Sequence, residues 1–176
     1  MIKKDLHPFR KKWGQNFLVD PNIVKKIFKT IDPKFSDRII EIGPGEGVLT
    51  QIILPKVSEM VAIEIDPLLV SRLNDSDQLK KLKIVNEDIL RTNIYDLDIQ
   101  NPVRVIGNIP YNITSQIIFW LLEQLDLWSD AFIMVQKEVA NRLTAKVGTK
   151  EYGRLTVVVG AYLDIDDCFT IPPSVF

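Results

Sequence analysis

Short apolar runs alternate with amphipathic segments along the whole chain. The apolar runs predict five buried strands, at Arg38–Ile42, Met60–Ile65, Lys83–Val85, Val103–Gly107 and Ala131–Val135. Helical patterns begin near Val48, after Asp66-Pro67, at the run IIFWLL and near Lys137–Leu143. Asp66 before Pro67 predicts an N-cap followed by proline at the first helical position, and Thr114 or Ser115 is expected to cap the IIFWLL helix.

This order of strands and helices predicts an α/β fold with a Rossmann-like, mostly parallel sheet and helices on both faces. Ligands of such sheets bind at the carboxyl ends of the strands, where the strand order reverses. The residues directly after the first four strands are therefore the candidates for chemistry. The run Leu155–Tyr162 fits a strand or a helix, and no final strand or closing helix follows it before the PPSVF end.

Composition is that of one globular domain: 176 residues, 46% hydrophobic and 26% charged. No apolar run approaches the roughly 18 residues that span a bilayer, and the charged start lacks the apolar stretch of a secretory signal. One cysteine, Cys168, and one histidine, His7, exclude an intrachain disulfide and predict no metal site. We therefore expect a cytoplasmic protein without a membrane partner.

The net charge of −1 conceals an uneven distribution. Residues 1–19 carry five cations, from Lys3 to Lys12, against Asp5 alone. We treat residues 1–20 as a basic N-terminal arm and residues 21–176 as the catalytic domain. The arm fits a phosphate-binding segment and equally a solvated terminus, so charge alone leaves both interpretations open.

A glycine-rich turn, Glu41-Ile42-Gly43-Pro44-Gly45-Glu46-Gly47, follows the first strand. Gly43 and Gly45 let a ligand approach the backbone closely. A dinucleotide fold requires G-x-G-x-x-G, and Val48 stands where its third glycine would be. The spacing favours S-adenosylmethionine over a nicotinamide or flavin dinucleotide.

Acidic residues follow the next two strands. Glu64 lies 21 residues after Gly43, a spacing that suits a carboxylate accepting from both ribose hydroxyls of a cofactor. Asp66 is the rival, but its place before Pro67 suits capping. Asp88 is a candidate acceptor for the amino group of the cofactor's adenine, with Ile89 against the ring.

The segment Gly107-Asn108-Ile109-Pro110-Tyr111 after the fourth strand is the sharpest motif. An adenine amine is a poor nucleophile because its lone pair is delocalised. The Asn108 side-chain oxygen and the Ile109 carbonyl can accept hydrogen bonds from the two N–H groups of this amine. Its lone pair would then point at a methyl group. Pro110 fixes the turn, and Tyr111 offers a face for an extruded base. An Asn-Pro turn with a core tyrosine is the structural alternative.

The blocks WGQNFLVD, EIGPGEGVLT, AIEID, GNIPYNIT, VQKEVANRL, KEYGRL and PPSVF closely resemble the ribosomal RNA adenine dimethyltransferases of the small-subunit type, from about residue 10 to the end. The resemblance implies a class I methyltransferase fold that dimethylates two adjacent adenosines near the 3′ end of 16S rRNA. It implies cofactor contacts at Asn16, Leu18, Gly43, Glu64, Asp88 and Asn108. It also places Phe176 on the face of the target base opposite Tyr111.

Family members continue with a last strand and a small helical, basic domain, so we expect the chain to be C-terminally truncated. The expected partner is 16S rRNA in the small subunit or its precursor, bound by a monomer. Three alternatives remain: a resistance-type enzyme acting on large-subunit rRNA, a non-catalytic RNA-binding assembly factor, and a nicotinamide oxidoreductase, against which Val48 argues.

Overall fold

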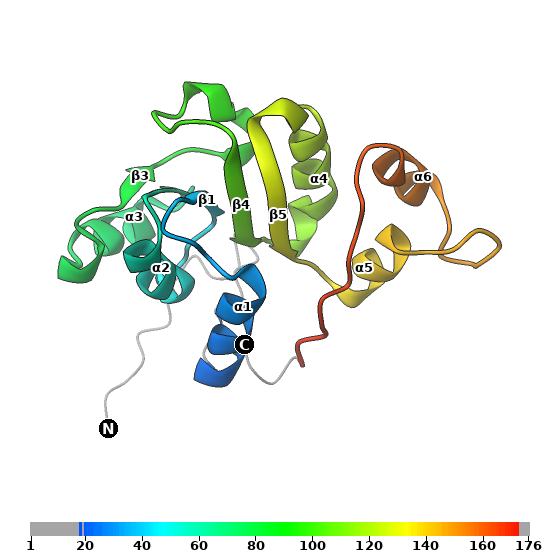
Figure 1. Cartoon of the computed structure of the whole chain (residues 1–176), viewed down its shortest axis with the longest axis horizontal. Helices are drawn as coiled ribbons and strands as arrows, with labels where there is room; N and C mark the ends of the chain where they lie inside the picture. Colours follow the sequence, from blue (N-terminus) through cyan, green and yellow to red (C-terminus); the bar gives the residue numbers. More distant parts are fainter. Residues whose placement is uncertain (1–17, 19, 173–176) are drawn as a thin grey trace.

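A five-stranded parallel sheet forms the centre of the molecule (Figure 1). The computed structural model describes Leu18 and residues 20–172. The strands are β1 (Arg38–Ile42), β2 (Glu59–Ile63), β3 (Lys83–Val85), β4 (Val103–Asn108) and β5 (Trp128–Met134), in the order β3-β2-β1-β4-β5. Every pairing is parallel, which confirms the predicted α/β class.

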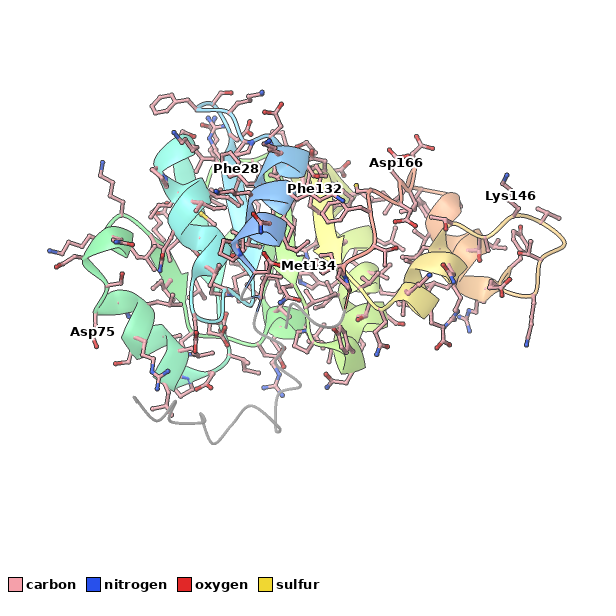
Figure 2. The ribbon with its side chains drawn as sticks, turned by 90° about the horizontal axis from the view of Figure 1, so that it is seen from below. Phe28, Asp75, Phe132, Met134, Lys146 and Asp166 are labelled. Atoms are coloured by element: carbon pink, nitrogen blue, oxygen red, sulfur yellow. The ribbon has the colours of Figure 1, made fainter. Side chains whose placement is uncertain are left out.

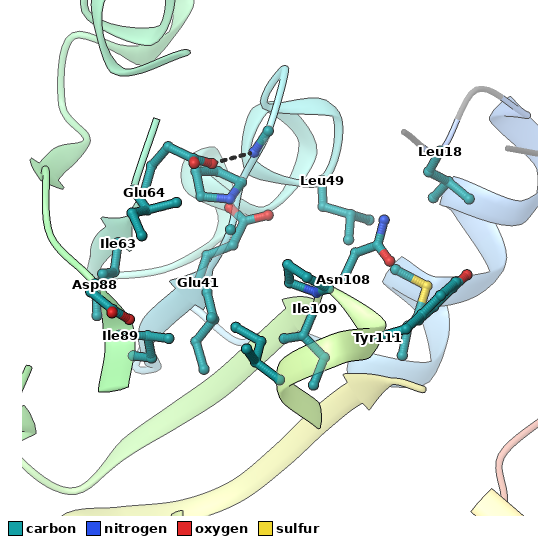
Figure 3. Close-up of a pocket in the computed structure, with 18 of the residues that line it drawn as sticks. Leu18, Glu41, Leu49, Ile63, Glu64, Asp88, Ile89, Asn108, Ile109 and Tyr111 are labelled. Atoms are coloured by element: carbon teal, nitrogen blue, oxygen red, sulfur yellow. Dashed lines mark hydrogen bonds between the residues drawn. The ribbon is translucent and has the colours of Figure 1, made fainter. Parts of the chain in front are cut away.

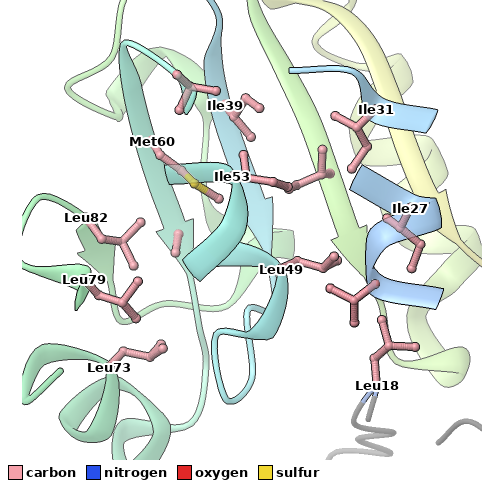
Figure 4. Packing of buried hydrophobic residues seen from close by; sticks show 14 residues of the cluster. Leu18, Ile27, Ile31, Ile39, Leu49, Ile53, Met60, Leu73, Leu79 and Leu82 are labelled. Atoms are coloured by element: carbon pink, nitrogen blue, oxygen red, sulfur yellow. The ribbon is translucent and has the colours of Figure 1, made fainter. Parts of the chain in front are cut away.

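Helices cover both faces of this sheet. Helices α1 (Pro21–Ile31), α2 (Val48–Ile53) and α3 (Pro67–Asn74) pack on one face through a shared apolar cluster (Figure 4). Helix α4 (Thr114–Leu122) packs on the other. Because successive residues of a strand point to opposite faces, Ile39 joins the first cluster and Ile40 the second.

Short 3₁₀ helices complete the connections. They are η1 (Leu54–Lys56), η2 (Asp77–Leu79), η3 (Ile89–Arg91), η4 (Ile94–Asp96), η5 (Tyr111–Ile113) and η6 (Leu125–Leu127). Within the described residues no helix is long and apolar enough to cross a membrane.

Two further helices, α5 (Lys137–Leu143) and α6 (Arg154–Gly160), form a hairpin beyond β5. The ambiguous run Leu155–Tyr162 is thus helical for most of its length. Leu155 and Val159 bury their side chains in a third cluster with Ile118 of α4. This packing selects a helix where the apolar pattern alone allowed a strand.

Two predicted strand boundaries were wrong by two residues or more. Strand β5 begins three residues before Ala131, because pairing with β4 extends through Trp128 and Asp130. Strand β2 ends at Ile63 rather than Ile65.

The predicted cap of the IIFWLL helix was also wrong. Ile113 occupies the N-cap position of α4 without a capping side chain, since η5 leads directly into the helix. The Thr114 hydroxyl instead donates to the carbonyls of Pro110 and Tyr111, at 3.5 and 3.3 Å. The Asp66 cap is confirmed, because its Oδ1 accepts from the Leu68 amide at 2.9 Å.

Arg104 ties together four segments at the amino end of the sheet. From β4 its guanidinium donates to both carboxylate oxygens of Asp130 at 2.9 Å and to Asp37 at 2.7 Å. It also donates to the Ile31 carbonyl at the end of α1, at 2.8 Å. The fork geometry of arginine makes such multiple contacts possible. The Arg104 side chain of β4 therefore connects β5, helix α1 and the turn before β1.

Candidate active site

A pocket lies at the carboxyl ends of β1, β2 and β4 (Figure 3). The strand order reverses between β1 and β4, because the chain passes from β1 outward to β3 and then returns to the other side of β1. This is the place where open parallel sheets bind ligands. The glycine turn and the Asn108–Tyr111 segment both line the pocket, as the sequence predicted.

The glycine turn adopts a backbone that other residues resist. Gly43 and Gly45 have φ values of 65° and 60°, in the left-handed region. The Gly43 amide donates to the Ile63 carbonyl at 2.9 Å, which joins the turn to the end of β2. The turn therefore lies at the carboxyl end of the sheet, where its residues line the pocket.

Glu64 connects the same turn to the chain after β2. Its Oε2 accepts from the Gly45 amide at 3.2 Å, and its Oε1 accepts from the Asp66 amide at 3.0 Å. The side chain is buried, and this burial raises the pKa of the Glu64 carboxyl although the two amides act in the opposite direction. Glu64 lines the pocket, whereas the rival Asp66 caps α3.

Glu41, to which the sequence assigned no role, is a second buried carboxylate of the pocket. Its Oε2 accepts from the Thr50 hydroxyl at 2.5 Å. Burial raises the pKa of Glu41 to about 7; the hydrogen bond from Thr50 lowers it, and the nearby Glu64 charge raises it further. A charged residue within the apolar strand RIIEI was the available signal.

Asp88 and Ile89 border the pocket after β3. The Asp88 Oδ1 accepts from the Leu90 amide at 3.0 Å and so caps η3. This capping bond uses one of the two carboxylate oxygens. Ile89 is buried and presents an apolar side chain to the pocket.

The Asn108–Tyr111 segment meets the glycine turn across the gap between β4 and β1. Gly107 packs so closely on Ile42 that an added Cβ would lie 3.0 Å from the Ile42 carbonyl oxygen. A Cβ added at Gly43 would lie 3.9 Å from the Asn108 carbonyl oxygen, so Asn108 lies beside the glycine turn. Ile109 is buried and Tyr111 is 36% exposed, so the tyrosine ring stands at the pocket mouth.

The charge of the pocket has one sign. Among the described residues that line it, the acidic side chains are Glu41, Glu46, Glu64, Glu87 and Asp88, with no lysine, arginine or histidine. In the same part of the chain, no group of three His, Cys, Asp or Glu side chains could hold a metal ion. Leu18 also lines the pocket, while Asn16 and Phe176 lie outside the described residues.

Residues 6–176 match the family model described as ribosomal RNA adenine dimethylase. The chain belongs to this family. A ribosomal RNA small subunit methyltransferase A of Alcanivorax borkumensis is 40% identical over 171 residues, which cover 97% of this chain and 61% of the relative. The chain thus spans about three fifths of the length of that relative.

Two solved structures agree with this assignment. A dimethyladenosine transferase from Plasmodium falciparum matches with a TM-score of 0.71 and 33% identity, over 81% of this chain and 51% of that one. The 23S rRNA methyltransferase ErmE matches with a TM-score of 0.66 and 31% identity, over 76% and 53%. The predicted class I methyltransferase fold is confirmed.

Proposed function

We propose that this dimethylase-family chain transfers methyl groups from S-adenosylmethionine to the N6 amino groups of two adjacent adenosines near the 3′ end of 16S rRNA, during maturation of the small subunit. It acts as a cytoplasmic monomer. The observation that carries the proposal is that Asn108, Ile109 and Tyr111 open into the same pocket as the glycine turn.

The charge of the pocket supports this cofactor. S-adenosylmethionine carries a sulfonium and no phosphate, whereas nicotinamide and flavin dinucleotides carry a pyrophosphate. The acidic side chains of the described lining favour a cationic ligand and repel phosphates. The described lining therefore fits the sulfonium cofactor and argues against an oxidoreductase.

Named residues would hold this cofactor. A carboxylate offers roughly four lone-pair positions. Glu64 has two backbone donors, which fix its orientation and leave capacity for the ribose hydroxyls. Asp88 would accept from the adenine amino group and Ile89 would contact the ring. Gly43, Gly45, Leu18 and, outside the described residues, Asn16 would complete the contacts.

When bound, the cofactor would supply a methyl group on a sulfonium, whose methyl–sulfur bond breaks to release a neutral thioether as the leaving group. The chain positions the nucleophile. The Asn108 side-chain oxygen and the Ile109 carbonyl accept hydrogen bonds from the two N–H groups of the target amine, so its lone pair points at the methyl group. After transfer the extra proton passes to solvent. Positioning of this kind is the main source of rate acceleration here.

Tyr111 would capture the base. Its partly exposed ring offers a stacking face at the pocket mouth. Phe176, which lies outside the described residues, would stack on the other face by its match to the family motif. Intact Asn108, Pro110 and Tyr111 favour catalysis over a purely RNA-binding role.

The small-subunit substrate is favoured by the names of the similar proteins. The relative at 40% identity is named for the small subunit, whereas the 23S enzyme is 31% identical.

Mapping of methylated adenines tests the proposal. The chain would be incubated with small-subunit particles, large-subunit RNA and labelled S-adenosylmethionine. We expect N6-dimethylation of two adjacent adenosines in 16S rRNA alone. Label in 23S rRNA would show that the chain has the resistance-type activity. Binding of cofactor and RNA without incorporation of label would show that it is a non-catalytic assembly factor.

A further inference from the structure

Two motifs of the chain, VQKEVANRL and KEYGRL, have no part in the proposed catalytic chemistry, yet the fold brings them together. The first forms α5 and the second leads into α6. We call residues 137–154 the basic hairpin. Its cations are Lys137, Arg142, Lys146, Lys150 and Arg154, against the carboxylates Glu138 and Glu151.

This excess of positive charge contrasts with the body of the domain. Residues 20–136 carry twelve lysines and arginines against seventeen carboxylates. All five hairpin cations are exposed, and none forms an ion pair within the part of the chain that the structure describes. Elsewhere, Lys80 and Lys83 are paired with carboxylates. The hairpin cations are thus available to an outside anion.

The basic hairpin starts at the pocket. Met134, the last residue of β5, lines the pocket and is the register partner of Asn108. Lys137 begins α5 three residues later. From there the hairpin extends away from the sheet to Lys146, which lies at the far end of the molecule from the pocket residue Met134 (Figure 2). Asp166 lies nearer the sheet than Lys146.

Side-chain hydrogen bonds hold the hairpin backbone at both its helix junction and its loop. The Thr156 hydroxyl donates to the Arg142 carbonyl at 2.6 Å and accepts from the Gly153 amide at 3.2 Å. In the loop, the Thr149 hydroxyl donates to the Lys146 carbonyl at 2.8 Å. Cations on a fixed backbone lose less conformational freedom when they bind than cations on a free tail.

We propose that the basic hairpin binds the phosphate backbone of the RNA whose adenine enters the pocket beside Tyr111. The inference rests on the proposed function, because it takes RNA as the substrate. A base that stacks on Tyr111 places the flanking backbone near the pocket mouth, where α5 begins. Arginine and lysine side chains bind phosphates there without reading sequence. Tyr152, 38% exposed, adds a stacking face within the hairpin.

A matched pair of triple variants tests this inference. The hairpin variant combines Arg142→Ala, Lys146→Ala and Lys150→Ala. The control combines Lys56→Ala, Lys80→Ala and Lys81→Ala, which removes the same charge from exposed positions before β2 and β3. None of these three lysines lines the pocket.

The measurement is the affinity for a single-stranded oligonucleotide with the 3′-terminal sequence of 16S rRNA, as a function of potassium chloride concentration. Each lost phosphate contact lowers the log–log salt slope by about 0.7 on single strands. We expect the hairpin variant to lose about 2 units of slope and about ten- to hundred-fold in affinity at 0.1 M salt. The control should keep the parent slope.

Equal slopes for the two variants, or no RNA binding by the parent, would overturn the inference. Stronger salt-sensitive binding to polyglutamate than to the RNA would also overturn it, in favour of an acidic protein partner. Calorimetry with S-adenosylmethionine separates the two proposals. A parent that methylates RNA while the hairpin variant keeps its slope refutes the hairpin alone. A parent that binds RNA through the hairpin without binding the cofactor refutes methyl transfer alone.

Discussion

The carboxylate of Glu41 accepts a hydrogen bond from the Thr50 hydroxyl at 2.5 Å, directly beneath the glycine turn. This bond joins the end of β1 to α2, and the glycine turn connects these two elements. Among the described residues it is the only hydrogen bond of the Glu41 side chain. A carboxylate so buried couples the stability of the fold to pH.

The first prediction concerns this coupling. Burial raises the pKa of Glu41 from 4.5 to about 7. Between these values the unfolded chain releases its proton while the folded chain keeps it, so stability falls as pH rises from about 4.5 to 7. The loss is roughly 3 kcal/mol for a shift of this size. Glu41→Gln should flatten this slope, because the amide stays neutral and its oxygen still accepts from Thr50.

Urea unfolding at pH 5, 6, 7 and 8 would measure the effect. Glu123→Gln, which removes an exposed carboxylate, is the control and should keep the parent slope. A Glu41→Gln variant with the same pH dependence as the parent would show that Glu41 ionises freely in the folded state.

The second prediction concerns the cofactor. Glu64→Ala should weaken S-adenosylmethionine binding by about 1.5–3 kcal/mol, the range for hydrogen bonds to a charged group. Glu87→Gln removes the same charge from the exposed rim of the pocket and should have a smaller effect. Calorimetry on both variants, and on the parent with NAD, would measure this. Equal losses of affinity in the two variants would show that Glu64 contributes only its negative charge and no specific hydrogen bonds to the cofactor.

The third prediction concerns Asn108. Asn108→Ala removes an acceptor that acts chiefly in the transition state, so RNA affinity should change little while the chemical step slows. By analogy with single oxyanion-hole donors, the rate should fall by about 10²–10³. Single-turnover methylation at saturating cofactor and RNA is the measurement, with cofactor affinity determined in parallel. A variant as fast as the parent would mean that the segment is only a structural turn.

The fourth prediction separates stacking from chemistry at Tyr111. Tyr111→Ala should weaken capture of the flipped base by about 1–3 kcal/mol. Tyr111→Phe keeps the ring and should be nearly silent. Comparison of RNA affinity and single-turnover rate in the two variants would decide the role. A large loss in Tyr111→Phe would assign a function to the hydroxyl.

The fifth prediction concerns the cations of the basic arm, which lie outside the described residues. Replacement of Arg10, Lys11 and Lys12 by Ala should weaken RNA binding. Each lost contact should reduce the log–log salt slope by about 0.7–0.9. Cofactor affinity should stay near the parent value. An unchanged slope would identify the arm as a solvated terminus.

Local chemistry predicted much of this fold and site. The Asp66 cap depends on neighbouring residues alone, and the structure places it as expected. The meeting of Gly43 with Asn108 follows from the parallel topology, although the two are 65 residues apart. The roles of these residues in binding and catalysis stay predictions.

The errors lie where tertiary contacts decide. Trp128 and Asp130 extend β5 because they pair with β4, which no local pattern indicated. The partnership of Glu41 with Thr50 depends on how α2 lies on β1, so the sequence showed a charged residue in an apolar strand but not its partner.

Arg104 has a consequence for the dynamics of the edge strand. Strand β5 pairs with β4 on one side, and such an outer strand ordinarily frays before the centre of a sheet. The guanidinium binds Asp130 on β5 and the last carbonyl of α1, so separation of either segment breaks contacts of the other. In amide hydrogen exchange, α1 and β5 should therefore open as one cooperative unit, although about 100 residues of chain separate them.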